Sequence, residues 1–120
     1  MTYTSRATVT EEMLAPSVGS GDLRVLSTPS LAALMENAAM LCVADMLPEG
    51  STTVGSRIEC SHLRPTPEGE AIEATATLQA VDGRRLTFNI TAFDTKGKIG
   101  EATHVRCIVD RQRFLAKLSH

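Results

Sequence analysis

A carboxylate near the middle of an apolar stretch is the first candidate for chemistry. The segment from Leu31 to Leu47, LAALMENAAMLCVADML, is apolar on almost every side of a helix, yet it carries Glu36 and Asn37. Such a helix is normally buried, and an unpaired buried carboxylate is costly. Apolar neighbours disfavour the charged form of Glu36, which suits a general base or a nucleophile. The alternative is an ion pair with an arginine at a subunit contact.

A histidine and a threonine are the next candidates. The alternating segment TTVGSRIECSHL predicts a strand whose inward face consists of Val54, Ile58, Cys60 and His62. A single core histidine is commonly held by a backbone carbonyl, but near a carboxylate His62 could relay a proton to a leaving group. Thr28 precedes Pro29, a pair typical of a helix N-cap followed by the first helical residue, so capping alone would explain Thr28.

Residues on two other strands could contact a ligand. Gly55 interrupts its strand, which indicates either a bulge or a close approach of the backbone to a ligand, where an N–H group could hold an oxyanion. His104 and Arg106 share one face of the last strand, and we expect His104 to be solvated. The three histidines, at positions 62, 104 and 120, lack the spacing of metal ligands, so we expect no metal and no cofactor.

The elements that position these residues follow a simple order. Residues 3–9 predict a short strand, and residues 28–47 predict a long helix that ends before Gly50. Four strands follow, and the last three form a meander whose first turn is Asp82-Gly83, a strong hairpin signal. One antiparallel sheet curled around one central helix satisfies this α+β pattern. Its open edges predict a partner subunit.

Composition narrows the function classes. The 120 residues predict a single domain, 1–120. A net charge of −2 and 3% aromatic residues, with no Trp, argue against nucleic-acid binding. The polar N-terminus does not resemble a secretory signal, and the apolar helix is shorter than the ~20 residues of a membrane span. Cys42, Cys60 and Cys107 form no CxxC pair, so we expect buried thiols in a cytoplasmic protein without membrane contact.

Four motifs give the sequence a family resemblance. VLSTPSLAALMENAA, TTVGSRIECSHLRPTPEG, AVDGRRLTFNITAFD and IGEATHVRCIV resemble, in order and spacing, the fluoroacetyl-CoA thioesterase branch of the hotdog-fold thioesterases. The resemblance implies a hotdog domain and a homodimer that hydrolyses acyl-CoA thioesters without a metal, with a tetramer left open. By motif position it implies catalytic roles for Thr28, Glu36 and His62, and substrate-binding roles for Gly55 and Arg106.

One segment departs from the family pattern. The family's fluoroacetyl-specific enzyme has a phenylalanine-bearing segment before its helix, whereas VGSGDLRVLST here has no aromatic residue, so we do not expect fluoroacetyl specificity. The expected activity is hydrolysis of a small or medium acyl-CoA, in which CoA is part of the substrate. A non-catalytic acyl-CoA sensor is the alternative, and hydration of an enoyl-CoA lacks the Asp/His pair that it would need.

The spacing of the candidates on the helix predicts a shared site. Thr28 and Glu36 are eight residues apart, or about 12 Å along a helix at ~1.5 Å per residue. They can hardly contact the same atom within one chain unless the cap loop folds back. A site shared across a dimer would remove the difficulty, with Glu36 from one subunit and Thr28 and His62 from the other. Arg64, Arg84, Arg85 and Lys117 are candidates for contact with the CoA phosphates, without a choice among them.

Overall fold

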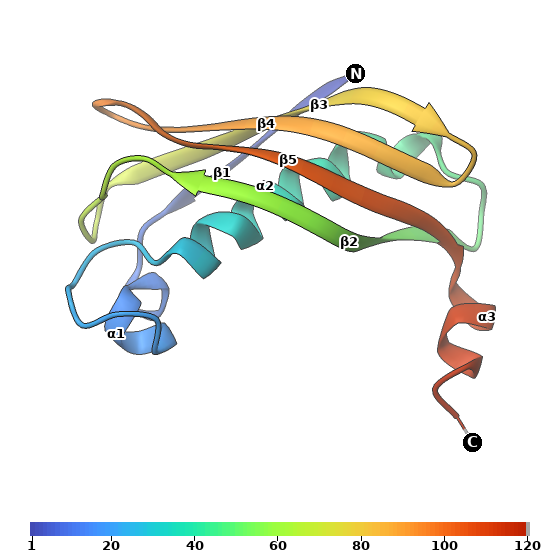
Figure 1. Ribbon diagram of the computed structural model, residues 1–120, viewed down its shortest axis with the longest axis horizontal. Helices are drawn as coiled ribbons and strands as arrows, with labels where there is room; N and C mark the ends of the chain where they lie inside the picture. Colours follow the sequence, from blue (N-terminus) through green and yellow to red (C-terminus); the bar gives the residue numbers. More distant parts are fainter. Residues whose placement is uncertain (120) are drawn as a thin grey trace.

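A five-stranded antiparallel sheet wraps one long helix in the computed structural model, which describes residues 1–119 (Figure 1). His120, one of the histidines considered above, lies outside the described residues. The strands are β1 (Thr2–Thr8), β2 (Ser51–His62), β3 (Ala71–Asp82), β4 (Arg85–Asp94) and β5 (Gly97–Asp110). The long helix is α2 (Thr28–Val43), and the short helices are η1 (Glu11–Met13), α1 (Ala15–Val18), η2 (Ala44–Met46) and α3 (Arg111–Ala116).

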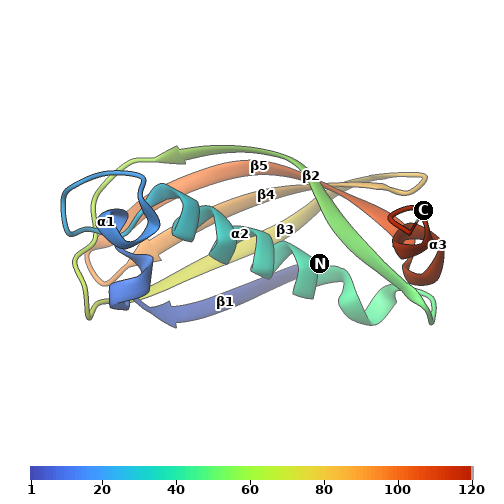
Figure 2. The ribbon, with the colours of Figure 1, turned by 90° about the horizontal axis from the view of Figure 1, so that it is seen from below.

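The sheet has the order β1-β3-β4-β5-β2, and every neighbouring pair is antiparallel. The predicted meander is confirmed as β3-β4-β5, with its first turn at Asp82 and Gly83, where Gly83 has a φ of 61°. Figure 2 shows the strands curving over α2, with β1 and β2 at the two sides. The two edge strands are therefore β1 and β2, as expected for an open curled sheet.

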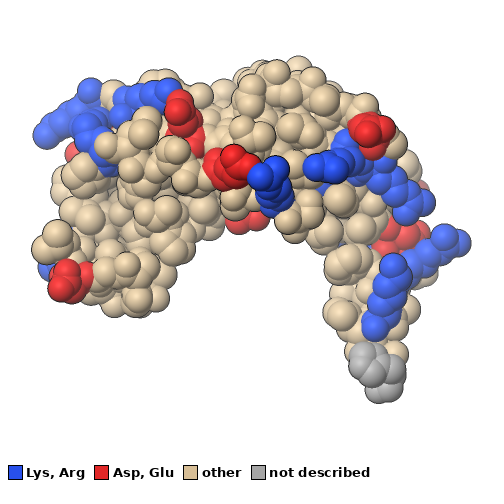
Figure 3. Space-filling model, in the orientation of Figure 1, with Lys and Arg blue, Asp and Glu red and all other residues tan. Residues whose placement is uncertain are grey.

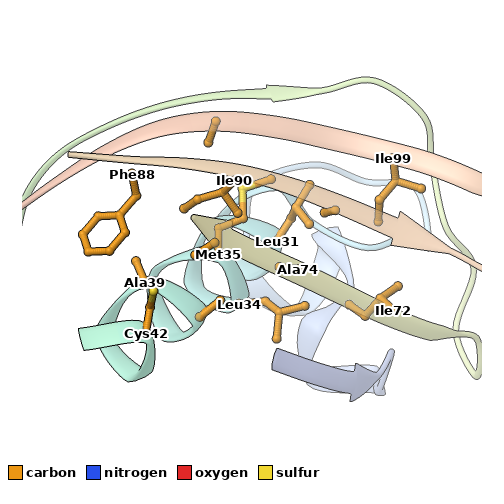
Figure 4. Packing of buried hydrophobic residues seen from close by; sticks show 14 of the residues in the cluster. Leu31, Leu34, Met35, Ala39, Cys42, Ile72, Ala74, Phe88, Ile90 and Ile99 are labelled. Carbon is orange, nitrogen blue, oxygen red and sulfur yellow. The ribbon is translucent and has the colours of Figure 1, made fainter. Parts of the chain in front are cut away.

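The core lies between α2 and the inward face of the sheet. Leu31, Leu34 and Met35 of α2 pack against inward side chains such as Ile90 and Ile99 (Figure 4). The alternating apolar residues of β3 and β4 supply the rest of this face, namely Ile72, Ala74, Ala76, Leu86, Phe88, Ile90 and Ala92. Burial of such side chains stabilises each by about 1.5–3 kcal/mol relative to exposure, so this contact holds the helix in place.

One side of α2 stays open, which differs from the fully buried helix predicted from the sequence. Ala33, Asn37 and Leu41, spaced four residues apart, are exposed along it. The difference arises because α2 packs mainly on β3 and β1 and makes less contact with β2 and β5. None of the helices formed by residues 1–119 is long and apolar enough to cross a membrane.

Two local features set the positions of the candidate side chains. Ser27, not Thr28, is the N-cap of α2, because its Oγ accepts the Ser30 N–H at 3.2 Å. The prediction that Thr28 caps the helix was therefore wrong, and capping does not explain its hydroxyl.

A bulge in β2 is the second feature. The pairing of β2 with β5 shifts between Gly55 and Arg57, so Ser56 is the extra residue of the bulge. The shift changes the alternation: Gly55 and Ile58 both face α2, and Val54 faces away from it. The predicted inward position of Val54 was therefore wrong. The inserted residue Ser56 means that the residues of β2 before the bulge face the opposite side from the one that strict alternation predicts.

Candidate active site

Thr28 and His62 meet at the N-terminal end of α2. The Oγ1 of Thr28 lies 2.8 Å from the Nδ1 of His62, which is the last residue of β2. Because Ser27 caps the helix, the Thr28 hydroxyl is free to make this contact. The other ring nitrogen of His62, Nε2, is buried and has no partner among the described residues. An unpaired buried polar atom is costly, so Nε2 needs an explanation, and a catalytic role is one of those possible.

Glu36 faces the bulge of β2 from the middle of α2. A Cβ atom added at Gly55 would lie 2.8 Å from Glu36 Oε2, which is too close for a stable contact. Glycine therefore lets the backbone of β2 approach the carboxylate, and the bulge and the close approach considered from the sequence both occur. Glu36 is half-buried and takes part in none of the ion pairs formed by residues 1–119. Within one chain the carboxylate is therefore not locked onto an arginine, and the alternative of an ion pair at a subunit contact stays a prediction.

Arg106 lies beside Glu36 and is held from one side. Its Nε donates to Thr53 Oγ1 at 2.8 Å, and its Nη2 donates to the Thr53 carbonyl oxygen at 3.0 Å. Its Nη1 lies 3.3 Å from His104 Nε2 and 3.4 Å from the position of a Cβ at Gly55. Arg106 is only 6% exposed, so the guanidinium is fixed in a buried position that faces Gly55 and Glu36.

Burial changes the protonation of both histidines. Burial lowers the pKa of His62, and a backbone hydrogen bond at Arg64 opposes this shift. Burial is also the main cause that lowers the pKa of His104; the charge of Arg106 adds to it, while the Arg57 carbonyl and the Glu36 carboxylate oppose it. Both rings are therefore neutral near pH 7, the form in which one ring nitrogen carries a lone pair.

A cavity of about 310 Å³ opens beside Thr28 and His62. Its apolar lining includes Ala15, Val25, Leu26, Leu63 and Pro65. Its volume is at the small end of the ~300–1,000 Å³ that small-molecule pockets occupy. The segment from Val18 to Thr28, which carries no aromatic residue, supplies part of this lining.

The structure thus gathers the predicted residues into two groups. Thr28 and His62 form one, and Glu36, Gly55 and Arg106 form the other. No hydrogen bond or ion pair among residues 1–119 joins the two groups. The part of the chain that the structure describes contains no cluster of three His, Cys, Asp or Glu side chains placed to hold a metal ion.

Three other residues named in the sequence analysis have structural contacts of their own. Asn37 accepts a hydrogen bond from Ser5 Oγ at 2.7 Å. Cys60 contacts the sulfur of Met35 at 3.7 Å, and burial raises the pKa of its thiol and of the Cys42 thiol, which disfavours the reactive thiolate. Cys42 is buried as expected, whereas Cys60 and Cys107 are only half-buried. Arg64 Nη2 is paired with Asp94 Oδ1 at 2.6 Å, which gives this side chain a structural contact, and its contact with a phosphate stays a prediction.

The sequence-based prediction placed one residue of the site wrongly and missed another. His104 was expected in solvent, but it is 1% exposed, and Thr53 was not considered. The alternation of β5 contained the signal, because His104 and Arg106 have the same parity as Ala102, a core residue. Thr53 gave no such signal, since only the bulge shows that it faces Arg106.

Comparison with known proteins finds similar thioesterases. The fluoroacetyl-CoA thioesterase of Streptantibioticus cattleyicolor is 35% identical over 94 residues, which span 78% of this chain and 68% of that protein. A solved structure of the fluoroacetyl-CoA thioesterase FlK superimposes with a TM-score of 0.93 at 28% identity, and covers 98% of this chain and 92% of its own.

More distant structures share the fold. A Thermus thermophilus member of the thioesterase superfamily gives a TM-score of 0.91 at 22% identity, covering 98% of this chain and 88% of its own. The predicted hotdog fold and the predicted family are both confirmed. The model of the family described as fluoroacetyl-CoA-specific thioesterase matches residues 9–112, and the chain belongs to that family.

Proposed function

We propose that this protein hydrolyses the thioester of a small or medium acyl-CoA, with Glu36, His62 and Thr28 as catalytic groups. Family membership gives the reaction class: the chain is an acyl-CoA thioesterase. The observation that carries the proposal is the position of the Glu36 carboxylate, which lies against the glycine backbone of β2 at Gly55 without an ion pair. A carboxylate kept unpaired beside an accessible backbone is available to attack or to activate water.

The chemistry follows from what each group can donate or accept. Glu36 either attacks the thioester carbonyl carbon or removes a proton from the attacking water, and both routes lead to a tetrahedral oxyanion. Arg106 and the backbone near Gly55 are the nearest donors to that oxyanion. The start of α2 offers less, because Pro29 has no N–H and the N–H groups of Ser30 and Leu31 already donate to Ser27.

His62 and Thr28 serve the leaving group in this proposal. When the carbon–sulfur bond breaks, the CoA thiolate takes a proton, and His62 Nε2 is the unpartnered polar atom available to relay it. The contact with Thr28 Oγ1 fixes the orientation of the ring. The apolar part of the cavity beside this pair would hold the acyl group, and the cavity volume of about 310 Å³ supports a small or medium chain.

We further propose that two copies of the chain complete each site. Glu36 and Thr28 are separated by eight residues of one helix, about 12 Å at ~1.5 Å per residue, which is too far for both to contact one carbonyl. The free edge of β2 and the exposed side of α2 with Leu41 give a second copy a surface on which to pack. The proposal is a homodimer, with a tetramer left open.

A mixed dimer tests the shared site. Glu36→Ala and His62→Ala homodimers should each be inactive, whereas mixing them should restore activity, because one of the two sites in the mixed dimer then contains both wild-type groups. A mixture that stays as inactive as its parents, although mass spectrometry shows that mixed dimers form, would place all three catalytic groups in one chain.

A panel of acyl-CoAs tests the activity itself. Thiol release should be seen with short and medium acyl chains and should be lost in Glu36→Ala. It should be unchanged by a chelator, since we propose that no metal or other cofactor takes part. Tight CoA binding without thiol release from any acyl-CoA would instead identify a sensor.

The nucleotide end of CoA carries phosphates, which need cations. Five basic side chains lie near the start of β4 and the end of β5 and have no ion-pair partner among residues 1–119. They are Arg84, Arg85, Arg111, Arg113 and Lys117. Contacts place them close together: the Arg84 carbonyl accepts the Ile108 N–H at 2.8 Å, and α3 begins three residues after Ile108. Figure 3 shows Lys and Arg side chains gathered at this end of the molecule.

We propose that this basic end, defined by those five cations, holds the CoA phosphates. Arg106 of the site and Arg111 of α3 are five residues apart, about 16 Å along an extended chain. The pantetheine arm would cover this distance between the thioester and the nucleotide. A cytoplasmic location is also part of the proposal, because the three cysteines are free thiols, as expected in a reducing compartment.

A further inference from the structure

The cluster of His104, Arg106 and Glu36 contains one buried polar residue to which the proposed reaction gives no role. His104 is 1% exposed, and it comes from β5 opposite Ile58 of β2. Its ring lies next to the site, because its Cε1 is 3.3 Å from the position that a Cβ at Gly55 would occupy. A buried polar side chain in this position needs an explanation through its partners.

The two ring nitrogens of His104 have different partners, and these partners fix the tautomer. Nδ1 lies 2.6 Å from the Arg57 carbonyl oxygen, which can only accept, so Nδ1 carries the hydrogen. In the neutral ring Nε2 then holds a lone pair. Arg106 Nη1 lies 3.3 Å from that atom and donates to it. His104 is therefore a neutral acceptor for the guanidinium.

The guanidinium of Arg106 is held by three of its five N–H groups. Two donate to Thr53, through Nε and Nη2, and one donates from Nη1 to His104. Nη1 carries a second hydrogen, and Nη1 lies 3.4 Å from the Cβ position at Gly55. Thr53 alone would hold one edge of the guanidinium, and His104 adds the contact at Nη1, the nitrogen nearest the site.

The neutrality of this acceptor has a chemical consequence. A carboxylate in the place of His104 would form an ion pair with Arg106 and would reduce the positive field at the site. A neutral nitrogen orients the guanidinium and leaves its charge available to Glu36 and to a developing oxyanion. Burial and the nearby Arg106 charge lower the pKa of His104, and both favour this neutral form.

We propose that His104 is a positioning residue that aims Arg106 Nη1 at the reacting thioester through its neutral Nε2 lone pair. This inference rests on the proposed function, because it assumes that the thioester binds beside Gly55, within reach of Glu36 and Arg106. It assigns His104 no direct contact with substrate.

A pair of substitutions separates the two contacts of the ring. In His104→Gln the amide oxygen reaches the position of Nε2 and can still accept from Arg106. In His104→Asn the shorter amide reaches the Arg57 carbonyl but not Arg106. We expect His104→Asn to lower kcat by about 10-fold to 100-fold, the range for the loss of a hydrogen bond to a charged group, and His104→Gln to stay within about threefold of wild type.

The same pair in an Arg106→Lys background tests whether His104 acts through Arg106. If it does, His104→Asn and His104→Gln should have equal kcat there, since the guanidinium that they position is gone. Equal kcat values for Asn and Gln in the wild-type background, with both proteins folded by their melting curves, would overturn the proposal. So would an undiminished difference between them in the Arg106→Lys background.

A spectroscopic measurement keeps the inference independent of activity. The Arg106 Nη nitrogens should give separate, slowly exchanging NMR signals in wild type and in His104→Gln, and signals that exchange faster in His104→Asn, where only Thr53 still holds the guanidinium. Averaged signals in wild type would refute the contact, whatever the enzyme does. A protein that shows the separate signals but releases no thiol from any acyl-CoA would retain the positioning contact and refute the proposed function instead.

Discussion

Replacement of Gly55 by alanine is the sharpest perturbation of the site. The added methyl group would lie 2.8 Å from Glu36 Oε2, whereas ordinary contacts begin at 3.4 Å, so the carboxylate must move by about 0.6 Å or more. His104 Cε1 at 3.3 Å and Arg106 Nη1 at 3.4 Å limit the directions in which the methyl group itself can be accommodated. A misplacement of about 1 Å in a catalytic group can reduce the rate ~100-fold, so we expect kcat to fall by one to two orders of magnitude.

The effect on stability should be much smaller. Gly55 does not have a positive φ, so its backbone accepts alanine, and the lost flexibility of the unfolded chain favours alanine by roughly 0.4–1 kcal/mol. The atom closest to the new methyl group is the end of a half-buried side chain, which can move. We therefore expect a melting temperature within about 4 °C of wild type.

Gly100→Ala is the matched control. Its methyl group would lie 2.9 Å from Leu31 Cδ2 and 3.0 Å from the Ser61 carbonyl oxygen, which is backbone and cannot move easily. It should cost about 1–3 kcal/mol of stability, as overpacking does, and lower kcat of the folded enzyme less than Gly55→Ala does, even though Gly100 pairs with His62. Acyl-CoA hydrolysis and thermal unfolding should be measured on both variants. Wild-type kcat in Gly55→Ala would refute the assignment of Glu36 as the reacting carboxylate.

Three further perturbations address the helix start, the histidines and the basic end. Ser27→Ala should lower the free energy of unfolding by about 1 kcal/mol, because the helix loses its N-cap. Thr28→Val should leave unfolding by urea nearly unchanged and reduce kcat. The opposite pattern would show that Thr28 is the N-cap. Burial, the main cause, lowers the folded-state pKa of His62 and of His104, so their neutral forms contribute stability that is complete above the unfolded value of about 6.5 and is lost as pH falls through the lowered values. The urea midpoint should accordingly decrease from pH 7 to pH 5, more steeply than in the His62→Gln and His104→Gln double variant, and parallel curves would exclude these two residues as the cause. Arg85→Gln combined with Arg111→Gln should raise KM for acyl-CoA several-fold but not for the same acyl-pantetheine, which lacks the nucleotide; Lys96→Gln, a cation outside the basic end, is the control, and equal effects on both substrates would place the phosphates elsewhere.

The elements could be predicted from the sequence because their signals are local. The alternation in β3 and β4 and the Asp82-Gly83 turn place those strands to within a few residues, and the apolar run at Leu31 predicts the helix. The helix cap was missed because Ser27 and Thr28 are both good caps, and only the structure shows which hydroxyl accepts the Ser30 N–H.

The contacts of the site depend on residues far apart in the sequence, which local patterns do not determine. Thr28 meets His62 across 34 residues, and Arg106 meets Thr53 across 53. The bulge between Gly55 and Arg57 decides which side chains of β2 face α2, and a single extra residue leaves no clear mark in an alternating sequence. The family motifs gave the residue identities, and the fold gave their grouping.

The separation of the two groups has a consequence for how the enzyme would be assembled. Each group is already ordered within one chain, Thr28 and His62 by their direct contact and Arg106 by Thr53 and His104. In the proposed dimer the second copy therefore needs only to bring one ordered group to the other, and little conformational entropy is lost when substrate binds. If the side chains of the two groups were flexible in the monomer, dimerisation would also have to order them, at a cost in conformational entropy. The hydrogen bonds inside the monomer thus favour a site that is completed by docking, with no rearrangement of its side chains.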